Sequence, residues 1–234
     1  MQDMLHLGIA WYVIFVASTV CHEAAHAFVA WRFGDHTAHQ AGLVTLNPIP
    51  HIQREPLGML VVPIIAFAMN GWLLGWGSSP YDPHWATRSP RRSALMSLAG
   101  PGTNLLLLLI AFGALWWGLA AGAFVPPRSP GFSHLVDATA PGTGWELGVT
   151  LLSVLFSLNL ILFVFNMLPV PPLDGSQLIM LFLPTATANR YQRAIASGQW
   201  ALMGLLIAWA VAWNIIRPIF DVAVTLLHPS VSYG

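Results

Sequence analysis

Long apolar runs alternate with short polar connections along the whole chain. Four runs are read as membrane helices, because a span needs roughly 20 predominantly apolar residues. They cover about residues 4–31, 94–125, 147–165 and 199–216. A fifth run, about residues 57–77, contains Pro63 and an Asn70-Gly71 pair, which are typical of a break or a turn. The pattern predicts an all-α polytopic membrane protein with about four to five transmembrane helices and a re-entrant or interfacial segment near 57–77.

Two further features of the organisation follow from the same pattern. The polar connection over residues 34–55 contains an apolar/polar alternation, which predicts a short β element near residues 42–47. We expect residues 1–234 to form one integral membrane domain, with a core at about 8–183 and a C-terminal helix at about 199–220.

Composition supports membrane insertion and argues against other classes of protein. Hydrophobic residues make up 56% of the chain and charged residues only 8%, whereas soluble domains carry about 25% charged residues. The formal net charge is zero, so nothing suggests a nucleic-acid partner. The sequence leaves the oligomeric state open.

Three ionisable side chains interrupt the first apolar run, in the stretch "VCHEAAHAF". His22 and His26 are four residues apart, a spacing that places both on one helix face and allows both to bind one zinc ion. Glu23 lies between them in the HExxH pattern, in which the glutamate is the general base of a metalloprotease. A histidine pair that bonds a neighbouring loop is the alternative. Ionisable groups within a bilayer are costly and usually mark function, which favours the metal.

Zinc in a hydrolase usually takes three protein ligands and leaves one position open. Asp174 is the one other acidic residue deep in apolar sequence, and it follows three prolines in "NMLPVPPLDGSQ". Irregular backbone at membrane depth is tolerated where it lines a cavity, so this break would turn the carboxylate toward the histidines. Asp174 as the cap of a short helix at 175–183 is the alternative, and both roles can coexist.

The pair "HEAAH" and "NMLPVPPLDG" resembles the site-2 protease family of intramembrane zinc metalloproteases, peptidase family M50, in its compact form without PDZ or CBS domains. The segments "LNPIPH" and "SPRRSALMSLAGPGTN" are also similar to family segments, so the resemblance covers roughly residues 8–183. A glycine at position 102, after the proline, departs from the bulkier residue expected there. Asn104 in this stretch is expected to pack or hydrogen-bond between helices.

The resemblance implies an activity and a set of roles. It implies one zinc ion held by His22, His26 and Asp174, with Glu23 as the catalytic base. Asn166 would bind the substrate or its oxyanion, and His51 would make a supporting hydrogen bond near the site. The substrates would be single-span membrane proteins, cut within their transmembrane segments.

The zinc site restricts the topology. Asp3 precedes the first helix and Arg32 follows it, which places the HExxH end in the cytoplasmic half of a prokaryotic plasma membrane. Asp174 reaches the same depth only if residues 57–77 enter the membrane and return on the same side. Residues 88–92, with three arginines, then stay cytoplasmic.

Two other functions fit the same residues. A zinc transporter or metal sensor would use the ligands without needing Glu23 as a base. An inactive relative could serve as a binding scaffold, although all four chemical residues are present. A zinc endopeptidase is the function that the sequence favours.

Overall fold

The computed structural model describes residues 2–70, 73, 75–140, 142, 144–196, 198, 200–231 and 233. Four long helices dominate it, namely α1 (Gln2–Arg32), α6 (Pro90–Ala120), α7 (Trp145–Asn166) and α9 (Ala201–Leu227). The shorter helices are α2 (Thr37–Gln40), α3 (Pro48–Arg54), η1 (Leu57–Val61, π-type), α4 (Val62–Asn70), α5 (Pro83–Arg88), η2 (Asp174–Leu181, 3₁₀-type) and α8 (Thr185–Ala196). Strands β1 (Phe124–Val125) and β2 (Asp137–Ala138) pair antiparallel.

The predicted all-α polytopic fold is confirmed. Within the described residues, the four long helices are each long and apolar enough to cross a membrane, and a bent helix pair raises the number to five if it counts as one span. A 27-residue helix is about 40 Å long, which exceeds the roughly 30 Å hydrocarbon core. The expected C-terminal helix is observed from Ala201, and Gln199 lies outside the described residues.

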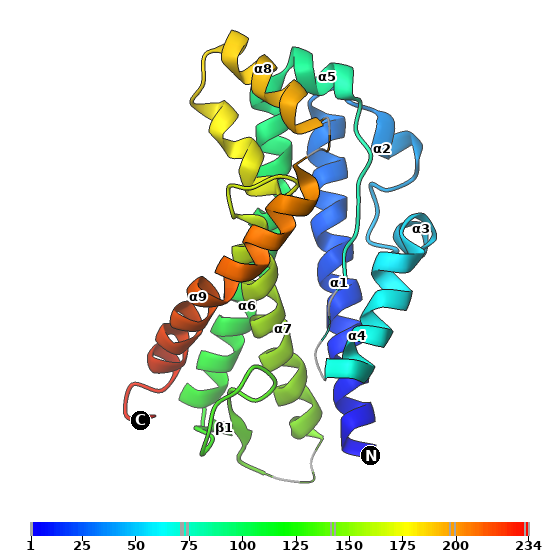
Figure 1. Cartoon of the computed structure of the whole chain (residues 1–234). Coiled ribbons are helices and arrows are strands. Elements are labelled where there is room, and N and C mark those ends of the chain that lie inside the picture. The colour runs from blue at the N-terminus through cyan, green and yellow to red at the C-terminus, as the bar shows by residue number, and fades with distance from the viewer. Residues whose placement is uncertain are drawn as a thin grey trace.

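Helices α1, α6 and α7 form the central bundle, and α9 crosses α7 on the side away from α4 (Figure 1). Helix α9 buries one stripe of small and apolar residues at four-residue spacing, namely Gly204, Ala208, Ala212, Ile216, Phe220 and Val224. Most of its other large apolar side chains are exposed, as expected of a helix that faces lipid on its remaining sides.

The start of α9 packs on the loop that precedes η2. A Cβ atom at Gly204 would overlap the carbonyl oxygen of Pro171. The backbone of α9 therefore approaches the proline-rich loop more closely than any other residue type would allow at this position.

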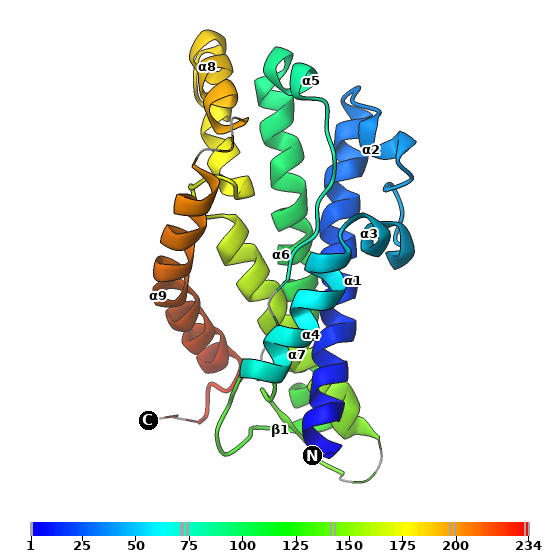
Figure 2. The same cartoon turned by 45° about the vertical axis from the view of Figure 1, so that its right-hand side comes forward.

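Residues 57–77 enter the bundle and return, as predicted. Helix α3 and the η1–α4 segment are bent by 111° at their junction. Helix α4 then runs beside the N-terminal half of α1, and the chain returns in extended form along α1 to α5 (Figures 1 and 2). The backbone N–H of Trp76 donates to the Gly58 carbonyl (3.1 Å), which ties the returning segment to η1. Of the expected Asn70-Gly71 turn, Asn70 ends α4 and Gly71 lies outside the described residues.

The prediction of a β element near residues 42–47 is wrong. These residues form a turn and bends, and Gly42 has a φ of +73°. Their polar groups bond locally: the Asn47 N–H donates to Thr45 Oγ1, and Asn47 Oδ1 caps α3 through the Ile49 N–H. A strand needs an adjacent partner, and no described strand lies beside this segment. The sheet that does form is within the loop after α6.

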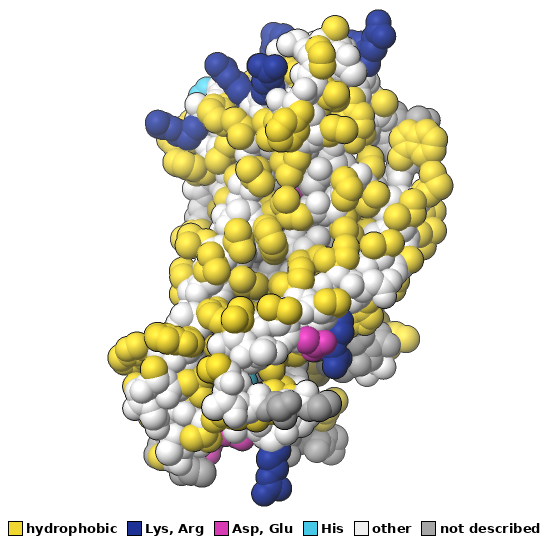
Figure 3. All heavy atoms as spheres, turned by 90° about the vertical axis from the view of Figure 1, so that its left-hand side faces the viewer, with side chains coloured by type: hydrophobic (Ala, Val, Ile, Leu, Met, Phe, Trp, Pro, Cys, Tyr) yellow, Lys and Arg dark blue, Asp and Glu magenta, His cyan; other side chains and the backbone are white. Residues whose placement is uncertain are grey.

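Positive charge gathers at one end of the molecule. Figure 3 shows arginine side chains at the end that carries α8, with a largely hydrophobic surface below them. Arg88 ends α5, Arg91 and Arg92 begin α6, and Arg190 and Arg193 lie on α8. The HExxH half of α1 points to this same end.

This topology predicts which residues share a side of the membrane. In a Cys21→Ala background, cysteines at the exposed positions His84 and Arg190 should react with an impermeant maleimide from one side. A cysteine at exposed Arg128, in the loop after α6, should react from the other side. A cysteine at exposed His36, in the connection before α3, should react from the same side as position 84. Labelling of positions 36 and 84 from opposite sides would show that residues 57–77 cross the membrane.

Candidate metal centre

His22 and His26 lie one turn apart on α1, with Glu23 next to His22, and α1 is helical without interruption from Gln2 to Arg32. All three side chains are buried within the bundle. The two imidazole rings face each other edge to face, with centroids 4.6 Å apart. The four-residue spacing therefore produces the shared face that the sequence predicted.

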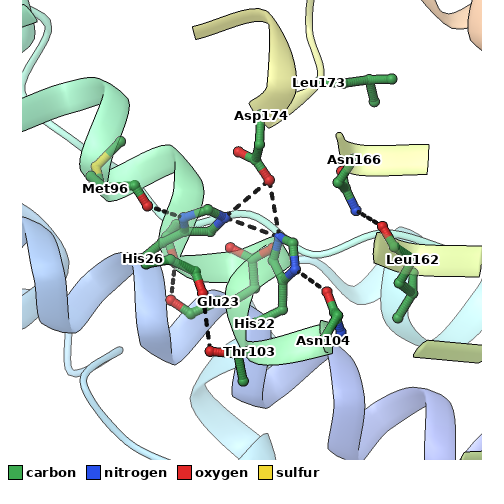
Figure 4. Close-up of polar contacts among 12 residues, drawn as sticks. His22, Glu23, His26, Met96, Thr103, Asn104, Leu162, Asn166, Leu173 and Asp174 are labelled. Atoms are coloured by element: carbon green, nitrogen blue, oxygen red, sulfur yellow. Dashed lines mark hydrogen bonds and ion pairs between the residues drawn. The ribbon is translucent and has the colours of Figure 1, made fainter. Parts of the chain in front are cut away.

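Asp174 reaches this face from the start of η2, which packs against α6. Helix α7 ends at Asn166, and the proline-rich residues that follow turn the chain before η2 begins at Asp174. Asp174 Oδ2 lies 3.2 Å from His22 Nε2 and 3.3 Å from His26 Nε2, as Figure 4 shows. No side-chain hydrogen bond caps η2, so the alternative role of Asp174 as a cap has no support here.

The three facing atoms have the dimensions of a zinc site. The two Nε2 atoms are 3.0 Å apart, so the triangle has sides of 3.0–3.3 Å. Zinc bonds of about 2.0–2.1 Å at tetrahedral angles place neighbouring ligand atoms about 3.3–3.4 Å apart. Two histidines and a carboxylate also match the donor set of catalytic zinc sites.

The other ring nitrogens have partners that favour metal binding. His26 Nδ1 lies 2.8 Å from the Met96 carbonyl oxygen, and His22 Nδ1 lies 2.5 Å from Asn104 Oδ1. Both partners are acceptors, so each Nδ1 carries the hydrogen and each Nε2 presents a lone pair. Three lone-pair atoms at such distances repel one another unless a cation lies between them, and partners of this kind are typical of metal-binding histidines.

A cavity of about 790 Å³ opens onto the triangle. Its wall comes from α1, the extended residues 75–81, the end of α7, the loop before η2 and the first turns of α9. Glu23 lines this cavity beside the histidines without contacting Asp174. A Cβ atom at Gly77 would lie 3.0 Å from Glu23 Oε1, so the extended segment covers the carboxylate closely.

Asn166 also lines the cavity, in agreement with a role near the substrate. Its Nδ2 donates to the Leu162 carbonyl oxygen (3.0 Å). An amide nitrogen carries two hydrogens, so one of them remains for a ligand in the cavity.

His51 lies elsewhere. It is buried on α3, and its Nε2 lies 3.0 Å from the Thr45 carbonyl oxygen. His51 holds the bend at residues 42–47, and among the described contacts it has none with the metal triangle.

Two features of the site were missed by reasoning from the sequence. The contact of His26 with the Met96 carbonyl could not be predicted from a motif, because every residue type has a backbone carbonyl. The extended segment at residues 75–81 carries no motif, although its run of glycine, serine and proline is typical of non-helical backbone. The interhelical hydrogen bond expected of Asn104 is confirmed.

Gly100 of α6 provides a sharp test of the geometry. A Cβ atom there would lie 2.5 Å from His22 Nε2 and would overlap His26 Nε2, whereas a Cβ at Gly102 would meet nothing within 4 Å. Overpacking costs about 1–3 kcal/mol, so Gly100→Ala should weaken zinc binding by about 5- to 140-fold.

The control is Gly102→Ala, which makes the same change a little further along the same helix. Chelator competition in detergent measures both affinities. Equal affinity of the two variants would contradict the placement of the metal against α6.

Comparison with known proteins adds an independent result. The model of peptidase family M50 matches residues 10–211. YwhC of Bacillus subtilis, named a candidate zinc metalloprotease, is 32% identical over 80% of this chain and 74% of its own. Rip2 of Mycolicibacterium smegmatis and of Mycobacterium tuberculosis strain H37Rv, with names of the same kind, are 31% and 32% identical over 88% of this chain and 69% of theirs. No solved structure matches at a significant level.

The match extends over most of the chain and includes both HExxH and the distal LDG. The triangle of possible metal ligands, the cavity beside it and these likenesses agree, and the chain belongs to peptidase family M50.

Proposed function

We propose that this protein is an intramembrane zinc endopeptidase of the site-2 type. It hydrolyses peptide bonds within the transmembrane segments of membrane-anchored, single-span proteins. One zinc ion is its cofactor, held by His22, His26 and Asp174.

One observation carries the proposal. A metal-sized triangle of ligand atoms lies within the bundle of apolar helices, with a glutamate and a large cavity beside it. A transporter or sensor needs the ligands alone, whereas a hydrolase also needs a base next to an open coordination position. Glu23 occupies the place of that base.

Each side chain has a defined part in the chemistry. A zinc ion bound at the triangle would act as a Lewis acid and would make water nucleophilic at neutral pH. Glu23 accepts the proton of the attacking water and later gives it to the leaving amine. Asn166 donates its second N–H to the substrate carbonyl oxygen, where negative charge develops in the transition state.

The extended segment supports binding of an unwound substrate. A transmembrane helix hides its peptide groups in internal hydrogen bonds, so it must unwind before hydrolysis. The N–H groups of Gly77, Ser78 and Tyr81 have no partner among the described residues. These three residues line the cavity, and their N–H groups would pair with an extended peptide as an added strand does. This segment takes the place of the strand once expected near residues 42–47.

The arginine distribution supports an orientation. Cytoplasmic ends of membrane helices are enriched in arginine and lysine, and the end with α5 and α8 carries the arginines of both elements. His22 is ten residues from Arg32, or about 15 Å along the helix. The metal site would thus lie in the cytoplasmic half of a prokaryotic plasma membrane.

Glu23→Gln tests the proposed base. The substitution keeps size and polarity but removes the proton acceptor, so cleavage of a single-span substrate should fall by about 10²- to 10⁴-fold. Zinc content should stay near that of the unaltered protein, because Glu23 is not a ligand. Cleavage assays in detergent and metal analysis of the same sample measure both.

Glu146→Gln, in the first turn of α7, is the matched control and should retain both properties. Undiminished cleavage by Glu23→Gln would reject the mechanism. Zinc binding by the unaltered protein without cleavage of any single-span substrate would favour a transporter or sensor.

Asn166→Ala tests the proposed oxyanion donor. Removing one such donor costs about 10²- to 10³-fold in kcat, and zinc content should not change. Steady-state kinetics would separate this from a loss of substrate binding, which raises KM instead. An unchanged kcat would remove Asn166 from the chemistry.

A further inference from the structure

Two asparagines lie deep in the bundle, where polar groups are expensive. Asn104 on α6 and Asn159 on α7 are both fully buried, and α7 is the most apolar of the four candidate spans. Burying an amide without hydrogen bonds costs several kcal/mol in an apolar medium. Their presence at this depth calls for a partner for each polar atom.

The amides form a continuous chain of hydrogen bonds that ends at the metal triangle. Asn159 Nδ2 donates to the Leu155 carbonyl oxygen (2.8 Å) and to Ser18 Oγ (2.9 Å). Asn104 Nδ2 donates to Asn159 Oδ1 (2.8 Å). Asn104 Oδ1 then faces His22 Nδ1, the link that Figure 4 shows.

The chain has a direction, and the Leu155 carbonyl sets it. A backbone carbonyl only accepts, so the Asn159 nitrogen must face it and the Asn159 oxygen must face Asn104. Asn104 therefore directs its nitrogen to Asn159 and its oxygen to His22. His22 Nδ1 must then carry the ring hydrogen, and Nε2 is left with a free lone pair.

We propose that Asn159 is a positioning residue for the metal ligand His22, acting through the orientation of the Asn104 amide. This inference rests on the metal centre of the proposed function, not on the identity of the substrate. With the Asn104 amide rotated by half a turn, its NH₂ would face Nδ1 and would favour the hydrogen on Nε2, where it blocks the metal. Asn159 excludes that rotated state, because two amide oxygens would then face each other.

The first test is the zinc affinity of Asn159→Leu, which keeps a side chain of similar size but removes the directing oxygen. Loss of such an outer partner lowers metal affinity by about 10- to 100-fold, and we expect a loss in that range. Ser157→Ala on the same helix is the control, since Ser157 Oγ is buried and has no partner within the described residues. Chelator competition measures affinity, and melting of the metal-free proteins in detergent measures folding.

The second test separates positioning from structural support. In Asn104→Asp both side-chain oxygens are acceptors, so His22 Nδ1 keeps its hydrogen whichever way the new carboxylate is turned. In this background the Asn159 oxygen only faces another acceptor, so adding Asn159→Leu should not lower zinc affinity, in contrast to the 10- to 100-fold loss of an outer partner. A purely structural role predicts the same loss in both backgrounds.

The outcomes are distinct. A loss with Asn159→Leu that disappears in the Asn104→Asp background supports the proposal. Equal affinity of Asn159→Leu and the unaltered protein, or an equal loss in both backgrounds, overturns it. Both results are read from zinc binding alone, so a failure of the proposed protease activity, seen in the Glu23→Gln comparison, stays distinguishable.

Discussion

Three electron-pair donors that face one another inside a lipid-embedded bundle form the constraint on which the rest of the structure depends. The nitrogens of His22 and His26 and the oxygen of Asp174 are 3.0–3.3 Å apart. The arrangement is stable with a cation at its centre. Other features of the bundle bring these three atoms together or fix which ring nitrogen each histidine directs toward the metal.

Three breaks in regular packing make the meeting possible. The bend between α3 and η1 sends residues 57–77 into the bundle and back, which keeps the start of α6 at the HExxH end. The proline-rich loop after α7 turns Asp174 inward. Gly100 lets α6 pass directly over the imidazoles.

Much of this was readable from the sequence, for identifiable reasons. The histidine pair was predictable because helix periodicity alone puts residues four apart on one face. Asp174 was predictable because acidic residues are rare in apolar sequence. The re-entrant path followed from requiring Asp174 and the histidines at one depth.

Other features could not be predicted because they depend on tertiary neighbours. The alternation at residues 42–47 looked like a strand, but Asn47 and Thr45 bonded locally and no described strand lay beside them. His51 belonged to a family-like segment yet supports that bend instead of the metal. The direction of the Asn159–Asn104 chain depends on a backbone carbonyl that no residue letter reveals. The contact between Gly204 and the Pro171 carbonyl has a wider consequence. The last helix does more than anchor the chain in lipid, because its backbone packs directly on the loop that leads to Asp174. Replacing α9 with another hydrophobic helix would therefore change the geometry around the metal, even if the new helix inserted equally well into the membrane.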